Sequence, residues 1–272
     1  MFDRNLLLRV LSAVVALPAV GLLVVWDERW AFAAFAFLMT GIALDEFARM
    51  TLQGRGAKER FVLVGGGVTL AVAVYSRPDL ALPATMLAVL AVASAQLFFA
   101  SDMGTAGARF GGSLAGVMYL GLLMTSLPLL QRDVVDGESW VFAAMGVTFS
   151  CDTGAYFAGR ALGKRKLAPA ISPGKTWAGF WGGVLAAVSF VFVAKLTFFP
   201  ALTLVDVAMV GIGAALLAPA GDLVESLLKR SAGVKDSGNL IPGHGGVLDR
   251  VDALVFVSAW VFAYAAFFRG AP

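Results

Sequence analysis

Cysteine and histidine are almost absent from this sequence, which has one of each, Cys151 and His244. A single cysteine excludes an intramolecular disulfide. Charged residues are also scarce, at 14% of 272 residues, whereas 59% are hydrophobic. A soluble protein of this length cannot bury so much apolar surface. The composition therefore predicts a polytopic membrane protein that forms a single membrane-embedded domain over residues 1–272.

Apolar runs long enough to cross a bilayer recur along the whole chain. They predict an all-α bundle of about nine transmembrane helices, with the two termini on opposite sides of the membrane. The first run follows Arg4 and Arg9, but it is longer than the apolar region of a typical signal peptide, so we interpret it as a retained helix. The expected spans lie near residues 7–26, 30–48, 61–76, 80–100, 110–130, 139–159, 176–199, 202–220 and 251–268.

Basic residues gather in one of the two sets of connecting loops. The loops near residues 49–60, 101–109, 160–175 and 221–250 carry most of the lysines and arginines. The positive-inside rule places these loops and the N-terminus in the cytoplasm. The net charge of +3 is thus spread over membrane loops, which argues against a nucleic-acid partner. We expect a multi-pass protein of the inner (cytoplasmic) membrane whose active-site loops face the cytoplasm.

The most polar part of the chain separates its last two apolar runs. In it, Asp222, Glu225, Ser226 and Lys229 are spaced so that they share one face of a helix, whereas Arg230 is turned about 100° away. This face would gather carboxylate, hydroxyl and ammonium groups at the edge of the membrane. Acids in such places are costly and usually functional.

A second acidic pair, Asp249 and Asp252, opens the final apolar run. The residues between the two acidic pairs prevent a regular helix and allow the backbone to approach a ligand; they include Gly238, Pro242, Gly243, Gly245 and Gly246. Two carboxylate pairs around a glycine-rich loop that contains a lysine predict a divalent metal holding phosphate oxygens. The alternative is a solvated loop between two spans.

Asp152 lies within the sixth expected span, where an acid should face a polar cavity or a cation rather than lipid. A structural hydrogen bond between helices is the alternative. Cys151, the residue before it, should then lie at the edge of this cavity, in contact with water but partly shielded by neighbouring helices. A thiol packed against another helix is the alternative. The basic residues at 160 and 164–166 are typical of a surface attracted to anionic lipid.

The segment from Ser172 through Gly174 and Lys175 to Thr176 invites comparison with a P-loop. That motif requires a glycine where this chain has Pro169, and it requires a preceding strand, which we do not expect here. A P-loop is therefore excluded. Backbone amides, a hydroxyl and a lysine at the start of a helix still favour a phosphate group.

Both polar segments resemble the signature of the phosphatidate cytidylyltransferases, also called CDP-diacylglycerol synthases. The matching residues of the later segment are Ser226, Lys229-Arg230, Lys235-Asp236, Gly238, Ile241-Pro242, His244-Gly245-Gly246 and Asp249-Arg250-Val251-Asp252. Those of the earlier segment are Asp152-Thr153-Gly154-Ala155-Tyr156, Gly159-Arg160, Pro169, Ser172-Pro173 and Lys175-Thr176-Trp177.

The sequence departs from the family pattern twice, at Gly174, where a lysine is expected, and at Ala178, where an acid is expected. Before residue 140 the resemblance is generic, with Asp45-Glu46-Phe47 as a weak echo. We expect residues 1–135 to serve packing, dimerisation and lipid access, and residues 136–272 to form the catalytic core.

The resemblance implies transfer of CMP from CTP to phosphatidate, giving CDP-diacylglycerol and pyrophosphate. The lipid phosphate is itself an anionic nucleophile, so the chemistry consists of bringing two polyanions together and offsetting their charge. Mg²⁺ is the expected cofactor, and the resemblance also implies a second cation such as K⁺ and a homodimer. CTP, phosphatidate and the lipid bilayer are the expected partners.

Each candidate residue has an expected role. We expect catalytic roles for Asp222, Asp249, Lys229, Arg230 and Lys235, and metal ligation by Asp222, Asp249 and Asp252. We expect substrate binding by Asp152, Ser172, Lys175, Thr176, Ser226, His244, Gly245, Gly246 and Arg250.

Two other functions compete with this one. An ion-coupled transporter would use Asp152 and Asp222 as coupling carboxylates, but it should also have interrupted helices in paired halves, which the sequence does not suggest. A phosphotransferase that uses a CDP-alcohol would share metal carboxylates, but it usually gathers them in a DGxxAR-type cluster that this chain lacks.

Overall fold

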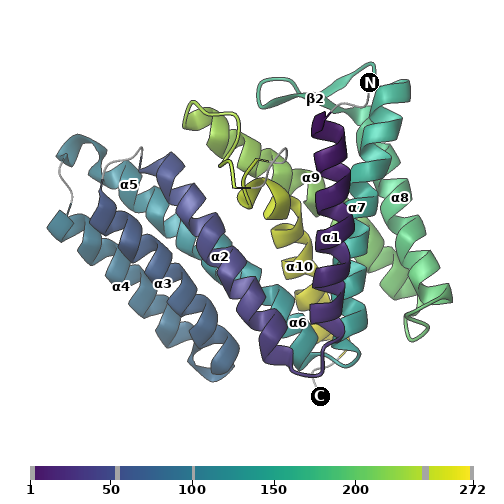
Figure 1. Cartoon of the computed structure of the whole chain (residues 1–272), viewed down its shortest axis with the longest axis horizontal. Coiled ribbons are helices and arrows are strands. Elements are labelled where there is room, and N and C mark those ends of the chain that lie inside the picture. The colour runs from purple at the N-terminus through teal and green to yellow at the C-terminus, as the bar shows by residue number, and fades with distance from the viewer. Residues whose placement is uncertain (1–3, 53–55, 100–101, 241–244, 270–272) are drawn as a thin grey trace. The chain divides into compact units, whose positions relative to one another are not determined.

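The structure is a computed structural model that describes residues 4–52, 56–99, 102–240 and 245–269. Helices dominate the described residues because the apolar runs satisfy their backbone hydrogen bonds internally. The α-helices are α1 (Arg4–Val25), α2 (Arg29–Thr51), α3 (Ala57–Ser76), α4 (Ala81–Phe99), α5 (Met103–Gly116), α6 (Ser126–Asp133), α7 (Gly137–Leu162), α8 (Trp177–Leu196), α9 (Leu204–Ser231) and α10 (Leu248–Phe268) (Figure 1). The 3-10 helix η1 (Pro78–Leu80) precedes α4, and the π-helix η2 (Val117–Leu122) and the 3-10 helix η3 (Leu123–Thr125) join α5 to α6.

Within the described residues, six helical stretches are long and apolar enough to cross a membrane. They are Arg29–Thr51, Pro78–Phe99, Met103–Asp133, Trp177–Leu196, Leu204–Ser231 and Leu248–Phe268. The prediction of an α-helical, multi-pass membrane protein is thereby confirmed. A total of about nine spans, and the side of the membrane on which each loop lies, stay predictions.

A small β-hairpin interrupts the helices, and the expectation that no strand precedes Ser172 is wrong. Strand β1 (Lys166–Ala168) pairs antiparallel with β2 (Ser172–Thr176), with Lys166 opposite Thr176. Prolines at 169 and 173 disfavour a helix here but are compatible with a turn and an edge strand. The Thr176 hydroxyl then accepts a hydrogen bond from the Gly179 amide at 3.1 Å, so the hairpin ends as the N-cap of α8.

The chain divides into two compact units, which are described separately. Unit 1 comprises Met1–Pro128 and Ser231–Arg250, and unit 2 comprises Leu129–Arg230 and Val251–Pro272. The glycine-rich segment 231–250 thus belongs to the same unit as the N-terminal helices, although its sequence suggested a place in the catalytic core. The functional division at residue 135 stays a prediction.

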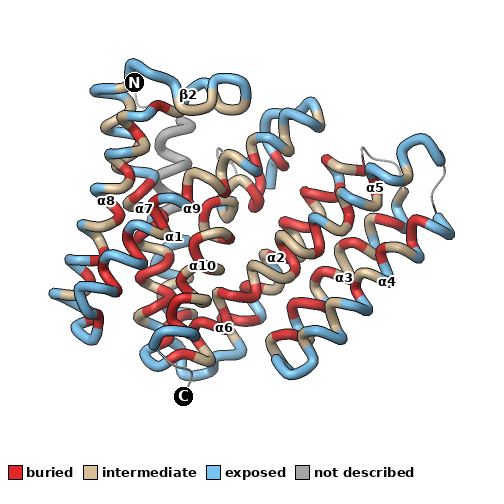
Figure 2. The backbone as a smooth tube through the Cα atoms, turned by 180° about the vertical axis from the view of Figure 1, so that it is seen from behind, coloured by how far each residue is buried: buried red, intermediate tan, exposed pale blue. Residues whose placement is uncertain are grey.

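In unit 1, helices α2, α3 and α4 run alongside one another (Figure 1). Helix α4 is buried along one side only, as the red and pale blue segments of Figure 2 show. Its buried residues are Ala88, Val92, Ala95 and Gln96. Leu82 and Leu90 on α4 are more than half exposed, at 66% and 61%. An exposed side made of leucines suits contact with lipid chains.

In unit 2, helices α7 and α8 lie side by side in both views (Figures 1 and 2). Small residues allow this approach: a Cβ atom placed on Gly154 would lie 2.6 Å from the Gly182 carbonyl oxygen. Buried Asp206 connects the start of α9 to the end of α10. It accepts hydrogen bonds from the Thr203 hydroxyl at 2.8 Å and from the Tyr264 hydroxyl at 2.7 Å.

Candidate active site

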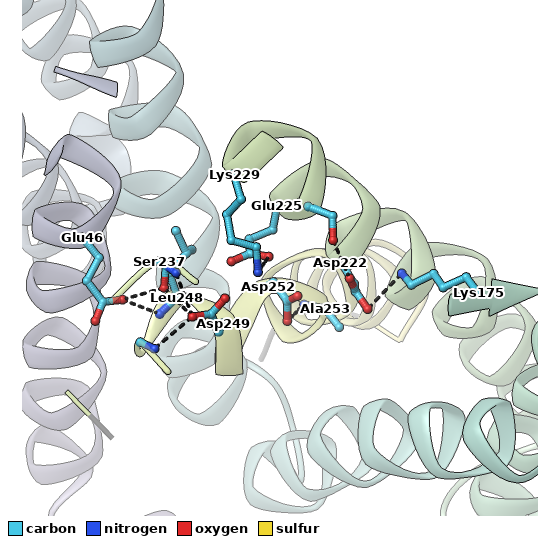
Figure 3. A network of polar contacts seen from close by, with 12 residues as sticks. Glu46, Lys175, Asp222, Glu225, Lys229, Ser237, Leu248, Asp249, Asp252 and Ala253 are labelled. Atoms are coloured by element: carbon cyan, nitrogen blue, oxygen red, sulfur yellow. Dashed lines mark hydrogen bonds and ion pairs between the residues drawn. The ribbon is translucent and has the colours of Figure 1, made fainter. Parts of the chain in front are cut away.

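In unit 2, the hairpin and helix α9 bring together two of the predicted site residues. The Lys175 ammonium lies 2.9 Å from Asp222 Oδ2 and also donates to the Pro219 carbonyl oxygen at 3.2 Å (Figure 3). The Ser226 hydroxyl donates to Asp222 Oδ1 at 3.2 Å. Asp222 therefore has a cation on one oxygen and a hydroxyl on the other, and its side chain is 38% exposed.

The predicted helix face on α9 is confirmed by contacts one turn apart. Asp222 contacts Ser226, and the Lys229 ammonium pairs with the Glu225 carboxylate. Glu225 is almost fully buried, at 1% exposure, and its partner Lys229 is 12% exposed at the side chain. Sequence reasoning placed Glu225 on this face but gave it no role. The structure gives it one, as the counter-ion that holds the Lys229 ammonium (Figure 3).

Asp252 joins this cluster from helix α10. Its electrostatic neighbours are Asp222, Asp152 and Lys229, and its Oδ1 accepts a hydrogen bond from the Ala253 amide at 2.8 Å. Gly221 makes the approach of the helices possible, because a Cβ atom there would lie 2.5 Å from the Asp252 carbonyl oxygen. Unit 2 thus gathers four carboxylates, those of Asp152, Asp222, Glu225 and Asp252, and two lysines, a mixture that suits a bound cation and a phosphate group.

In unit 1, Asp249 is held by the segment that precedes α10. Its Oδ2 accepts hydrogen bonds from the Ser237 amide at 3.0 Å, the Ser237 hydroxyl at 2.8 Å and the Gly246 amide at 2.9 Å. The bond to Gly246, three residues back, has the form of a capping box at the start of a helix. Gly245 has a φ of +80°, and a Cβ atom there would lie 2.7 Å from Asp249 Oδ2. The glycines therefore make room for the protein's own carboxylate, in addition to any ligand.

Glu46 on α2 contacts the residues around Asp249, although the sequence analysis named it only within a weak echo of the family pattern. Its carboxylate is buried, at 6% exposure for the residue. Its Oε1 accepts from the Val247 amide at 3.0 Å, and its Oε2 accepts from the Leu248 amide at 2.9 Å and lies 3.2 Å from the Ser237 hydroxyl (Figure 3). An acid within an expected transmembrane span was the available signal. Its partners, about 200 positions away, could not be read from local spacing.

Glu46 and Ser237 also line a cavity of about 960 Å³ in unit 1. Most of its lining surface is apolar, with side chains from α2 and α3, and its polar lining residues are Asp45, Glu46, Arg49, Ser237 and Asn239. The network around Asp249 is therefore adjacent to open space within this unit.

Several other predicted residues have different surroundings. Arg230, Lys235 and Arg250 are exposed, as is Asp152, and His244 lies outside the described residues. Ser172 is half-buried in β2, and Thr176 is buried with its hydroxyl at the start of α8. Cys151 is buried at 3% exposure, and a Cβ atom on Gly183 of α8 would lie 3.0 Å from its sulfur. The expectation that Cys151 contacts water is thus wrong, because α8 covers it.

The carboxylates of the described residues do not form a complete metal site by themselves. Over the part of the chain that the structure describes, no group of three or more His, Cys, Asp or Glu side chains could hold a metal ion by itself. Mg²⁺ rarely needs such a group, because it is usually bound by one or two carboxylates together with waters and substrate phosphates. Asp222 and Asp252 supply carboxylates of this type in unit 2, and they fit Mg²⁺ in their donor chemistry.

Comparison with known proteins agrees with the chemistry of these clusters. The profile of the cytidylyltransferase family matches residues 7–268. The phosphatidate cytidylyltransferase of Brucella suis biovar 1 is 45% identical over 159 residues, which is 58% of this chain and 58% of that protein. The Pseudomonas aeruginosa protein of the same name is 36% identical over 254 residues, covering 90% of this chain and 92% of that protein. The one from Bacillus subtilis is 43% identical over 132 residues, 48% of this chain and 49% of that protein.

The match to the Brucella proteins spans somewhat more than half of their length, 58%. The family profile, in contrast, covers nearly the whole chain, from the first expected span to the last. It includes both polar segments, with every candidate residue described above. This chain belongs to the cytidylyltransferase family.

Proposed function

We propose that this protein is a phosphatidate cytidylyltransferase, which converts CTP and phosphatidate into CDP-diacylglycerol and pyrophosphate. The observation that carries the proposal is the ion pair between Lys175 and Asp222. It joins a phosphate-binding group at the start of α8 to a cation-binding group on α9. The relatives named above carry this activity in their names, which supports the same substrates here.

In the proposed reaction, a phosphate oxygen of phosphatidate attacks the α-phosphorus of CTP. A phosphorus–oxygen bond forms there, and the bond from the α-phosphorus to the bridging oxygen of the β-phosphate breaks. Pyrophosphate leaves with the electron pair. No proton must be removed from the nucleophile, because the lipid phosphate is already ionised. This explains why the site needs charged groups rather than a serine or cysteine nucleophile.

Lys175 and Lys229 would hold phosphate oxygens and offset the negative charge that develops on them. Asp222 and Asp252 would hold Mg²⁺, which when bound supplies charge neutralisation and orientation of the triphosphate. Asp249 is also proposed as a cation ligand. Arg230, Lys235 and Arg250 are exposed and would meet the lipid phosphate or the nucleotide. We also propose that the other predicted binding residues contact the substrates. A second cation such as K⁺ binds, and the protein forms a homodimer.

We also propose that the reaction takes place on the cytoplasmic face of the inner membrane. The basic loops support this orientation. An ion-coupled transporter is not favoured, since the chain belongs to a family of transferases. Because that family is a cytidylyltransferase family, its match also weighs against a CDP-alcohol phosphotransferase.

The direct experiment is incubation of the purified protein with cytidine-labelled CTP, phosphatidate and Mg²⁺. The proposal predicts a chloroform-soluble cytidine product that disappears when phosphatidate is omitted or when a chelator is added. Label that stays in the aqueous phase with a folded protein would refute the proposal. Product formed equally well in the chelator would refute the Mg²⁺ requirement alone.

A further inference from the structure

Two carboxylates from distant parts of the sequence, the buried Glu46 and the half-buried Asp249, contact the same residues of unit 1. Asp249 binds the amide and the hydroxyl of Ser237 and the amide of Gly246. Glu46 binds the amides of Val247 and Leu248 and lies within hydrogen-bond distance of the Ser237 hydroxyl. A serine hydroxyl has one proton to donate. Ser237 therefore lies between Glu46 and Asp249 and can donate to either of them.

Glu46 also satisfies the start of helix α10. The first amides of a helix have no partner within it, and they form the positive end of the helix dipole. Val247 and Leu248 supply two such amides, and both residues are buried, at 3% and 0% exposure. Water cannot replace a partner there at low cost, so the Glu46 carboxylate is the group that fixes where α10 begins. Asp249 is the second residue of that helix.

Two glycines lie so close to the Glu46 carboxylate that a side chain at either position would collide with it. A Cβ atom on Gly238 would lie 2.6 Å from Glu46 Oε1, and one on Gly246 would collide with Glu46 Oε2 and with the Ser237 hydroxyl. The backbone at Gly238 and Gly246 therefore lies too close to Glu46 to carry a side chain.

We infer that Glu46 is a positioning residue of the transferase site: it acts through Ser237 and the amides before α10 to fix the orientation of the Asp249 carboxylate. This inference rests on the proposed function for its catalytic consequence, since Asp249 is a proposed cation ligand. Its structural part, the link between Glu46 and Asp249, holds for any reaction that the site performs.

The first test is hydrogen exchange of the full-length protein in detergent, which requires no substrate. Glu46→Gln keeps the size of the side chain but replaces one carboxylate oxygen by an amide group that cannot accept. Amides of residues 246–248 should exchange about tenfold faster in this variant than in the wild type. Asp45→Asn is the matched control, because Asp45 directly precedes Glu46 on α2 and pairs instead with Arg49, at 2.8 Å, and with Arg60. It should leave this exchange unchanged.

The second test is a double-mutant cycle on turnover, with Glu46→Gln, Asp249→Asn and the double variant. Glu46→Gln should lower turnover about tenfold. If Glu46 acts through Asp249, adding this change to Asp249→Asn should cost less than about twofold, because the group being positioned is already lost. If the two residues had independent roles, the fold-losses of turnover in the single variants would multiply in the double variant.

Either of two results overturns the inference: exchange at 246–248 that is unchanged in Glu46→Gln, or losses of turnover that multiply. If Glu46→Gln does not fold, Ser237→Ala takes its place in both tests, because it removes the hydroxyl that lies between the carboxylates. Should the wild type make no CDP-diacylglycerol, the proposed function fails, whereas the exchange experiment still decides the link between Glu46 and Asp249.

Discussion

Lys175 of the hairpin and Asp222 of helix α9 form an ion pair of 2.9 Å across 47 positions of sequence. The pair joins the two polar segments that stand out in the sequence. It gives Asp222 one cationic partner before any metal or nucleotide is considered.

The first prediction concerns this carboxylate. Asp222→Asn should lower turnover by at least about 100-fold, the scale of losing one electrostatic contact to the transition state. The amide keeps the size of the side chain but cannot neutralise Lys175 or a cation. Protein yield should stay near that of the wild type, because the Asp222 side chain is 38% exposed.

The matched control is Asp79→Asn, which removes an exposed carboxylate paired with Arg77 at 2.8 Å in unit 1. Its turnover should equal that of the wild type within about twofold. Turnover of Asp222→Asn within a few-fold of the wild type would remove Asp222 from the reacting site.

The second prediction separates the two basic residues at the end of α9. Lys229 pairs with buried Glu225, whereas Arg230 is exposed and turned about 100° away on the helix. Lys229→Ala should raise the KM for CTP and, by leaving Glu225 without its counter-ion, lower stability by about 3 kcal/mol. Arg230→Ala should raise the KM for phosphatidate and leave stability unchanged. Equal effects of the two variants on both substrates would show that α9 does not separate the ligands.

A third prediction concerns stability away from the candidate site. Tyr264→Phe removes a hydroxyl that donates to buried Asp206 at 2.7 Å. The apparent melting temperature in detergent should fall, corresponding to a loss of about 1–3 kcal/mol. Turnover at a temperature well below melting should be unchanged. Tyr156→Phe, at a 58% exposed tyrosine, is the control and should not alter the melting temperature. An unchanged melting temperature in Tyr264→Phe would mean that this hydrogen bond does not stabilise the fold.

The fourth prediction tests the orientation of the loops. Cysteines introduced at Lys164 and Lys235, both exposed, should react with a membrane-impermeant maleimide only from the cytoplasmic side of sealed vesicles. The native thiol adds little background, because Cys151 is 3% exposed. Labelling of either introduced cysteine from the opposite side would contradict the orientation and the access of cytosolic CTP.

Local patterns predicted what depends on local physics. The helices follow from apolar runs, and the contacts of Asp222 with Ser226 and of Glu225 with Lys229 follow from helical spacing. The hairpin was not predicted because its strands have only three and five residues. Strands this short give no periodic pattern of apolar residues.

The partners of Glu46 were missed for a different reason. Its hydrogen bonds to Val247 and Leu248 connect residues 201 and 202 positions apart, so only the tertiary fold brings them together. The burial of Cys151 likewise depends on the neighbouring helix α8 and not on the residues beside it in sequence. The glycine-rich segment was expected to admit a ligand, and the structure adds that it admits two carboxylates of the protein itself.

The most direct measurement of the central claim follows the two ends of the triphosphate separately. Purified protein is incubated with phosphatidate, Mg²⁺ and CTP labelled at either the α- or the γ-phosphorus. We predict that the α-label enters the chloroform-soluble lipid and that the γ-label is released as pyrophosphate in equal amount. If γ-label appeared in the lipid, or if neither label left CTP, this chain would not be a phosphatidate cytidylyltransferase.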